Sequence, residues 1–97
     1  MEKVCILLAN GFETIEALTP LDYIRRVGGE KSAILVSTTG DLNVKSAQGV
    51  TVKADCLIDE LDAETLTAII IPGGLPGATS LRDNDQVINL IKIMYED

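Results

Sequence analysis

The chain has 97 residues, enough for one small domain, and its hydrophobic share of 46% is high for that length. Its 15 acidic and 8 basic residues give a formal net charge of -7 without a basic cluster, which disfavours nucleic acid as a partner. Because histidine is absent, we expect no zinc site and no His-dependent catalytic pair. The sequence has neither a signal-peptide pattern nor an apolar run of ~18 residues, so we expect a cytoplasmic protein that does not enter the membrane.

The first part of the chain predicts a strand, a helix and a second strand. Residues 3–9 form a short apolar run before the turn pair Asn10-Gly11, which is typical of an inner strand of a parallel sheet. A helical pattern begins near Glu13, but Thr19-Pro20 fits a helix N-cap followed by a first-turn proline, so the helix either starts there or is kinked there. Gly28-Gly29 predicts its end, and the second strand is expected at residues 31–37.

The remaining pattern extends this alternation. Four elements are predicted: a hairpin from 42–45 and 50–54 with its bend at Gln48-Gly49, a short helix or extended connection at 57–61, a strand at 66–71, and a helix at 83–95 with Asp83 and Gln86 as a capping box. This order predicts an α/β fold with a mainly parallel sheet. Since a helix on such a sheet normally leads to another strand, we expect residues 1–97 to be the N-terminal portion of a single larger domain; the alternative is a small domain that ends in a helix.

Two loops at strand ends carry the residues that could bind a ligand. If the strands at 3–9 and 66–71 are neighbours, the loop through Glu13 and the turn Pro72-Gly73-Gly74 face one crevice. The amides of Gly73 and Gly74 could bind an oxyanion or a carboxylate, although an ordinary turn is the simpler interpretation. Glu13 and Glu16 could place a carboxyl group there for proton transfer, or could be solvated acids in a first helical turn.

The other reactive side chains have structural explanations. Cys5 lies within the first strand and is expected to be a small core residue, whereas Cys56 could be a surface thiol without a neighbouring positive charge to activate it. Arg25 and Arg26 are expected to complement the C-terminal end of the first helix. A flavin-binding protein is disfavoured because no Ser/Thr/Gly-rich phosphate loop follows the first strand.

Two segments together resemble a known family. Residues 8–17, LANGFETIEA, and residues 70–78, IIPGGLPGA, closely resemble the ThiJ/PfpI family, nearest the DJ-1-like branch that contains the human Parkinson-disease protein deglycase and bacterial ThiJ. The resemblance extends over essentially the whole chain. It implies a doubly wound, flavodoxin-like fold related to class I glutamine amidotransferases.

The resemblance also implies roles for individual residues. Glu16 matches the glutamate that hydrogen-bonds the family's cysteine nucleophile, Gly74 matches the oxyanion amide, Gly73 supports the turn, and Glu13 lies at the pocket rim. The family's nucleophile follows the strand after the helix at 83–95, so neither Cys5 nor Cys56 matches it and the chain lacks a nucleophile. No cofactor and no metal are implied.

What the resemblance implies about function concerns the complete protein. That form would act on small reactive carbonyl compounds as a glyoxalase or deglycase, or in thiol-dependent stress protection. Members of the family have also been assigned to thiazole monophosphate biosynthesis and to intracellular proteolysis. The 97 residues alone are expected to be inactive. Expected partners are a second copy, with Ile15 and Arg26 facing it, or a complementary C-terminal polypeptide. The alternative is a non-enzymatic anion- or protein-binding α/β module.

Overall fold

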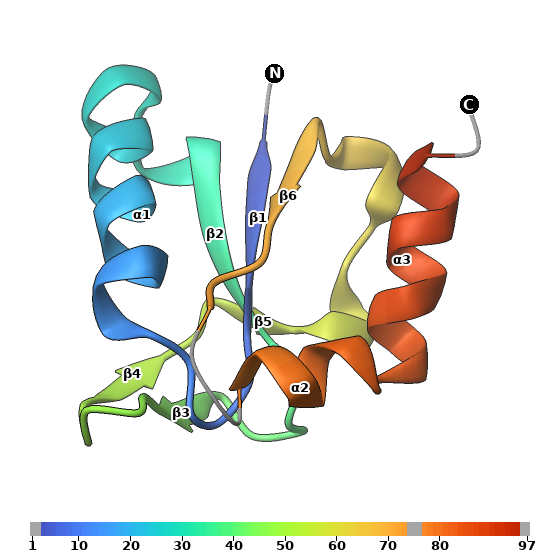
Figure 1. Ribbon diagram of the computed structural model, residues 1–97. Helices are drawn as coiled ribbons and strands as arrows, with labels where there is room; N and C mark the ends of the chain where they lie inside the picture. Colours follow the sequence, from blue (N-terminus) through green and yellow to red (C-terminus); the bar gives the residue numbers. More distant parts are fainter. Residues whose placement is uncertain (1–2, 74–76, 96–97) are drawn as a thin grey trace.

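A four-stranded parallel sheet forms the centre of the molecule. The computed structural model describes residues 3–73 and 77–95 (Figure 1). Within them the sheet has the strand order β5-β2-β1-β6, from Cys56–Leu57, Ala33–Ser37, Val4–Leu8 and Ala68–Ile70. All three strand pairs are parallel. The prediction of an α/β fold with a parallel sheet is therefore confirmed.

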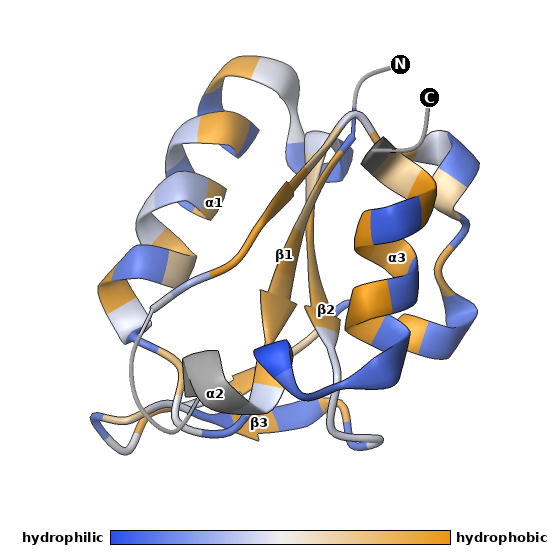
Figure 2. Cartoon of the chain, turned by 45° about the vertical axis from the view of Figure 1, so that its right-hand side comes forward, coloured by the Kyte–Doolittle hydropathy of each residue, from blue (hydrophilic) through white to orange (hydrophobic). Residues whose placement is uncertain are grey.

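Strand β1 is inside because both of its faces are covered. Its neighbours are β2 on one side and β6 on the other, with Cys5 level with Ile34 and with Ile69. Cys5 and Leu7 pack in the cluster that includes Val87 of helix α3 (Asp85–Tyr95), whereas Ile6 and Leu8 pack in the cluster that includes Ala17 of helix α1 (Thr14–Gly28). Alternate side chains thus serve two cores, and Figure 2 shows β1 and β2 as apolar strands between the mixed helices α1 and α3.

Helix α1 is a single helix from Thr14 to Gly28. It begins at the early position rather than at Thr19, and it continues through Pro20, whose missing N–H removes one helical hydrogen bond. A start at Thr19 is therefore wrong; the N-cap is Glu13, whose Oε1 accepts from Ile15 N at 3.0 Å. The predicted end is confirmed, because Gly29 has a φ of 93°, a value that favours glycine.

The segment between β2 and β6 contains the predicted hairpin. Strands β3 (Asn43–Lys45) and β4 (Thr51–Lys53) are antiparallel and form a sheet of their own. The uncertain segment at 57–61 is now resolved: β5 leads into a 3₁₀ turn, Ile58–Glu60, and a second such turn follows at Ala63–Thr65. Pattern analysis missed β5, which has only two residues.

The last part of the chain contains two helices where one was predicted. Helix α2 covers Gly77–Arg82 and helix α3 covers Asp85–Tyr95. The predicted cap at Asp83 is wrong, because Asn84 Oδ1 accepts from Gln86 N at 2.9 Å and from Val87 N at 3.2 Å. The Asn84 side chain also donates to Thr38 O at 3.3 Å, so this cap joins α3 to the loop after β2.

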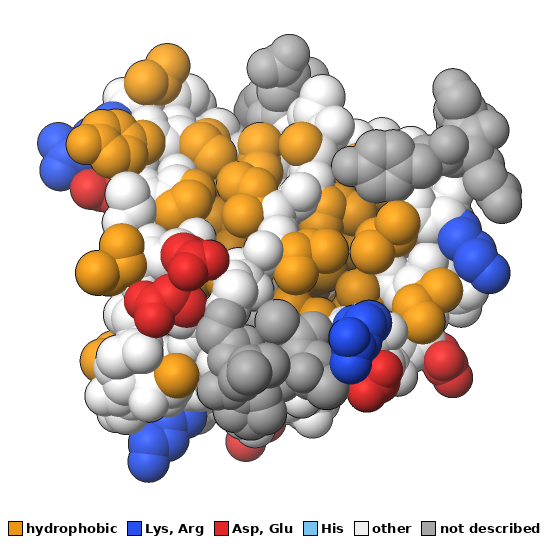
Figure 3. Space-filling view, viewed as in Figure 1, with side chains coloured by type: hydrophobic (Ala, Val, Ile, Leu, Met, Phe, Trp, Pro, Cys, Tyr) orange, Lys and Arg blue, Asp and Glu red, His pale blue; other side chains and the backbone are white. Residues whose placement is uncertain are grey.

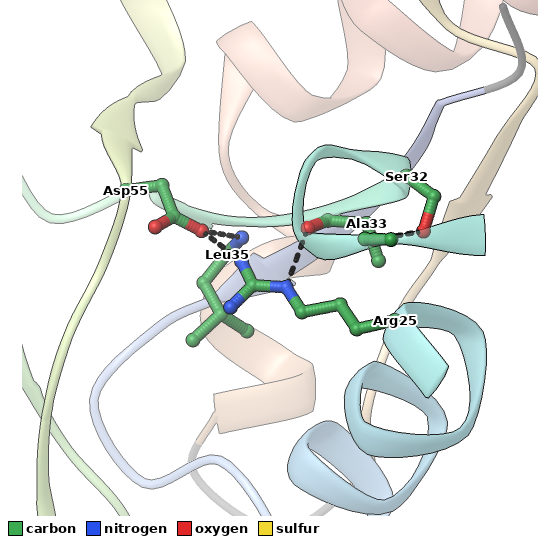
Figure 4. A network of polar contacts seen from close by, with 6 residues as sticks. Arg25, Ser32, Ala33, Leu35 and Asp55 are labelled. Carbon is green, nitrogen blue, oxygen red and sulfur yellow. Dashed lines mark hydrogen bonds and ion pairs between the residues drawn. The ribbon is translucent and has the colours of Figure 1, made fainter. Parts of the chain in front are cut away.

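A polar network joins α1 to the edge of the sheet (Figure 4). Arg25 Nε donates to Ala33 O at 3.0 Å, and its Nη2 lies 2.9 Å from Asp55 Oδ2. The same carboxylate oxygen accepts from Leu35 N at 2.8 Å. Arg25 therefore does more than complement the end of its helix, while Arg26 pairs with Asp22 on the exposed side of α1.

Candidate functional site

The two loops singled out from the sequence meet at one edge of the sheet. Strands β1 and β6 are adjacent and parallel, so the loops that follow them leave from the same edge. The backbone joins them directly, because Glu13 N donates to Gly73 O at 2.9 Å. Residues about 60 positions apart in sequence thus form one local arrangement.

Glu16 and Gly73 are the centre of this arrangement. Glu16 Oε1 accepts a hydrogen bond of 2.9 Å from Gly73 N. A Cβ added to Gly73 would lie 2.8 Å from the same oxygen, so any other residue would displace the carboxylate. Glycine at 73 therefore allows the acid to reach the backbone, and the Gly73 amide is occupied by Glu16 itself.

Two further residues were predicted to belong to the site, Gly74 and Glu13. Gly74, predicted to supply the oxyanion amide, lies outside the described residues. Glu13 does lie beside Gly73, but its carboxylate caps α1 through Ile15 N. The structure thus brings Glu13, Glu16 and Gly73 together, and their chemical roles stay predictions.

Gln48 is a neighbour of this site that sequence reasoning treated only as a bend residue. Its Oε1 accepts from Thr14 N at 3.2 Å and from Thr14 Oγ1 at 2.8 Å. The hairpin also contacts the loop after β1, since Gly11 N donates to Lys45 O at 2.8 Å. No local signal could have found this contact, because 34 residues separate Gln48 from Thr14.

The two thiols belong to a different part of the molecule. Cys5 is fully buried, and burial, with a smaller contribution from Cys56, raises the pKa of its thiol to about 12. The pKa of Cys56 is also raised, chiefly by burial and then by Glu60 and Asp55, against the opposing charge of Lys3. Both pack in the cluster with α3, whereas the helix that carries Glu16 packs on the other cluster. At neutral pH both are protonated and weakly nucleophilic.

Two kinds of feature are absent from the part of the chain that the structure describes. Within residues 3–73 and 77–95, no three Cys, Asp or Glu side chains are grouped so that they could hold a metal ion. None of the helices found there combines the length and the apolar character needed to cross a membrane.

Comparison with protein families identifies the chain. The model of the DJ-1/PfpI family matches residues 2–97. The chain belongs to the DJ-1/PfpI family. The resemblance seen in the two sequence segments is thereby confirmed, and the Glu16–Gly73 arrangement is a feature of a DJ-1/PfpI chain.

Individual DJ-1/PfpI relatives agree with this assignment. The chain is 34% identical to a deglycase of Thermococcus kodakarensis, over 98% of this chain and 55% of the deglycase. Its fold matches oxidised DJ-1 of Toxoplasma gondii with a TM-score of 0.86 and 38% identity, over 94% of this chain and 48% of that one. A mutant DJ-1 superfamily protein of Salmonella typhimurium matches with a TM-score of 0.87 and 32% identity, over 97% and 50%. This chain thus spans about half the length of these relatives, and its fold is a partial flavodoxin-like fold.

Proposed function

We propose that this chain supplies the glutamate and glycine half of a cysteine-dependent site that acts on small reactive carbonyl compounds. The observation that carries the proposal is the 2.9 Å hydrogen bond between Glu16 and Gly73 at the edge where β1 and β6 end. A held carboxyl group can exchange a proton with a nucleophile. Because the Gly73 amide is occupied by Glu16, the oxyanion amide of this proposal is that of Gly74, as the family resemblance implies. The deglycase name of the Thermococcus relative supports this substrate class.

The proposed site needs a nucleophile from residues beyond these 97. Burial raises the pKa of both cysteines, and a thiol activated for attack needs a lowered pKa instead. The 97-residue chain is therefore expected to show no turnover by itself. Both cysteines are free thiols, which is consistent with the proposed cytoplasmic location, where thiols are kept reduced.

The surface beside β6 supports a complementary polypeptide as the partner in this proposal. Strand β6 pairs with β1 and, within the described residues, has no strand on its other edge. Figure 3 shows hydrophobic side chains gathered on both sides of this strand, between α1 and α3. A hollow of about 260 Å³ on the α3 side is lined by Ile71, Leu81, Arg82, Val87, Ile88 and Ile91. An added apolar strand and helix would cover it.

The test joins these 97 residues to the part of the Thermococcus deglycase that follows its matched stretch, and measures loss of methylglyoxal. The fusion is expected to be active, and Glu16→Gln is expected to lower kcat/KM by about 100-fold or more, as loss of a proton-transfer group does. Glu30→Gln, the same change at an exposed acid on the turn after α1, is the control. Turnover by the 97 residues alone, or a cooperatively folded fusion without turnover, would contradict the proposal.

A non-enzymatic binding module is the second candidate, favoured by the exposed apolar surface beside β6. It predicts that the chain purifies as one stable species with a cooperative thermal transition and binds a partner without turnover. Intact-mass analysis of the native assembly separates the two, since the proposed enzyme requires further residues that carry a reactive cysteine, either in the same polypeptide or in a second one. Assays of the same fusion with methylglyoxal and with a peptide substrate would distinguish an enzyme that acts on carbonyl compounds from a protease.

A further inference from the structure

The hairpin at residues 43–53 holds the start of the helix that carries Glu16. At its turn, Gln48 Oε1 lies 3.2 Å from Thr14 N and 2.8 Å from Thr14 Oγ1. A backbone N–H can only donate, so the side chain of Gln48 presents its carbonyl oxygen to Thr14. One acceptor on the hairpin thus binds two donors of one residue on α1.

These bonds meet a need of the helix. The first N–H groups of a helix have no partner within it. Ile15 N is satisfied by Glu13, the residue just before the helix, whereas Thr14 N is satisfied by Gln48 from a separate element. The bond from Gln48 therefore ties the start of α1 to the hairpin, in addition to the backbone bond that ties Glu13 N to Gly73 O.

The hairpin is itself held in place. Gly11 N donates to Lys45 O and Ala47 N donates to Phe12 O, each at 2.8 Å, and Phe12 is fully buried. Ser46 closes the turn, because Ser46 N donates to Val50 O and Val50 N donates to Ser46 Oγ. Gln48 therefore extends from a turn whose position is fixed against the loop after β1.

We infer that Gln48 is a positioning residue: by holding Thr14, it determines where the first turn of α1 places the Glu16 carboxylate opposite the Gly73 amide. Glu16 lies two residues beyond Thr14, within the same helical turn. The consequence for catalysis rests on the proposed function, but the positioning itself does not. It can be measured without any substrate.

The test measures solvent exchange of the Gly73 amide by NMR in the 97-residue chain. Glu16→Ala removes the acceptor and is expected to raise the exchange rate, and Gln48→Ala should raise it by about two- to tenfold, the population change that corresponds to one net hydrogen bond. Gln48→Glu keeps an acceptor oxygen of the same reach and should restore the rate to within about twofold. Lys53→Ala, an exposed change elsewhere on the hairpin, should leave the rate unchanged.

A double-variant cycle separates positioning from general loosening. If Gln48 acts through Glu16, Gln48→Ala adds nothing to the exchange rate of Gly73 in a Glu16→Ala background. An additive effect, faster exchange at Leu7 in β1 as well, or an unchanged Gly73 rate in Gln48→Ala would overturn the inference. In the active fusion, Gln48→Ala should lower kcat with little change in KM; an inactive fusion would contradict the proposed function while leaving the exchange result intact.

Discussion

At the residue scale, the described part of the chain holds the Glu16 carboxylate against a backbone amide and gives Cys5 and Cys56 thiols with a raised pKa. Glu16 reaches the Gly73 amide because Gly73 has no side chain to displace it. Cys5 lies in the middle of the sheet, and the low polarity there favours its neutral form. The two kinds of group therefore lie in different surroundings: Glu16 is held where β1 and β6 end, whereas both cysteines pack in the cluster with α3.

The raised pKa of Cys5 predicts a loss of stability in alkali. Burial raises this pKa from 9.0 to about 12, so between these values the folded protein retains a proton that the unfolded chain releases. The stability from this group is complete below pH 9 and is lost as the pH approaches 12, with a slope of up to about 1.4 kcal/mol per pH unit. Urea unfolding at pH 8 to 11 measures it, and Cys5→Ala should show a shallower slope. Equal slopes in both proteins would refute this explanation.

At the element scale, the ends of strands and helices depend on side chains from elsewhere. Asn84 caps α3 and at the same time contacts the loop after β2. Asp55 accepts a hydrogen bond from β2 just before β5 begins, and so extends the edge pairing beyond two residues. The positions where these helices and strands end therefore depend on contacts with other segments as well as on the local conformational preferences of their residues.

Replacement of the α3 cap distinguishes the observed cap from the predicted one. Asn84→Ala removes the acceptor for Gln86 N and Val87 N, so the free energy of unfolding should fall by about 0.5–2 kcal/mol. Asp83→Ala is the matched control, and it should change the stability by less than about 0.5 kcal/mol. Urea titration of both variants measures the difference. A larger loss in Asp83→Ala would instead favour the capping box expected from the sequence.

The network of Arg25 and Asp55 should stabilise the edge of the sheet. Asp55→Ala leaves Leu35 N, in a partly buried position, without its acceptor, which should cost about 1–3 kcal/mol of the free energy of unfolding. Asp22→Ala breaks the solvent-exposed pair with Arg26 and should cost about 0.5 kcal/mol or less. Denaturant unfolding of the two variants gives the comparison. Equal losses would show that Asp55 acts only as a surface charge.

At the scale of the whole molecule, apolar surface beside β6 is left uncovered. Ile71, directly after this strand, is 47% exposed, and Ile88 of α3 is exposed nearby in the same hollow. Large apolar patches of this kind mark contact surfaces or cause association. The complementary polypeptide expected from the sequence would remove this area from water, whereas the expected second copy would instead face Ile15 and Arg26 on α1.

The exposed apolar surface beside β6 predicts that the 97-residue chain associates with itself at high concentration. Ile71→Asp should raise the dissociation constant by about tenfold or more, because burial of one large apolar side chain contributes about 1.5–3 kcal/mol. Sedimentation over a concentration series measures it, with Val50→Asp on the hairpin as the control. If Ile15→Asp on α1 weakens association instead, the contact lies on the first helix.

Much of the fold was predictable because its signals are local. The apolar run before Asn10-Gly11 predicts an inner strand, and Gly28-Gly29 predicts the end of α1, since each depends on residues close together in the chain. Local signals are compatible with two starting positions for α1, because Pro20 favours the later one. Packing of Ala17 in the core and capping by Glu13 favour the earlier one.

The candidate site was predictable only in outline. The amino-acid order alone specifies an α/β chain and the two loops that could line a site, because strand periodicity and turn residues act over a few positions. The DJ-1/PfpI family follows from the resemblance of two segments and from the family match, not from these patterns. The bond from Gly73 to Glu16, the contact of Gln48 with Thr14 and the cap at Asn84 follow from the folded arrangement. The first two contacts join residues that are far apart in the sequence. The third decides between Asp83 and Asn84, two neighbouring residues that are both suited to cap a helix, and contacts with distant segments such as Thr38 O determine which of them does so.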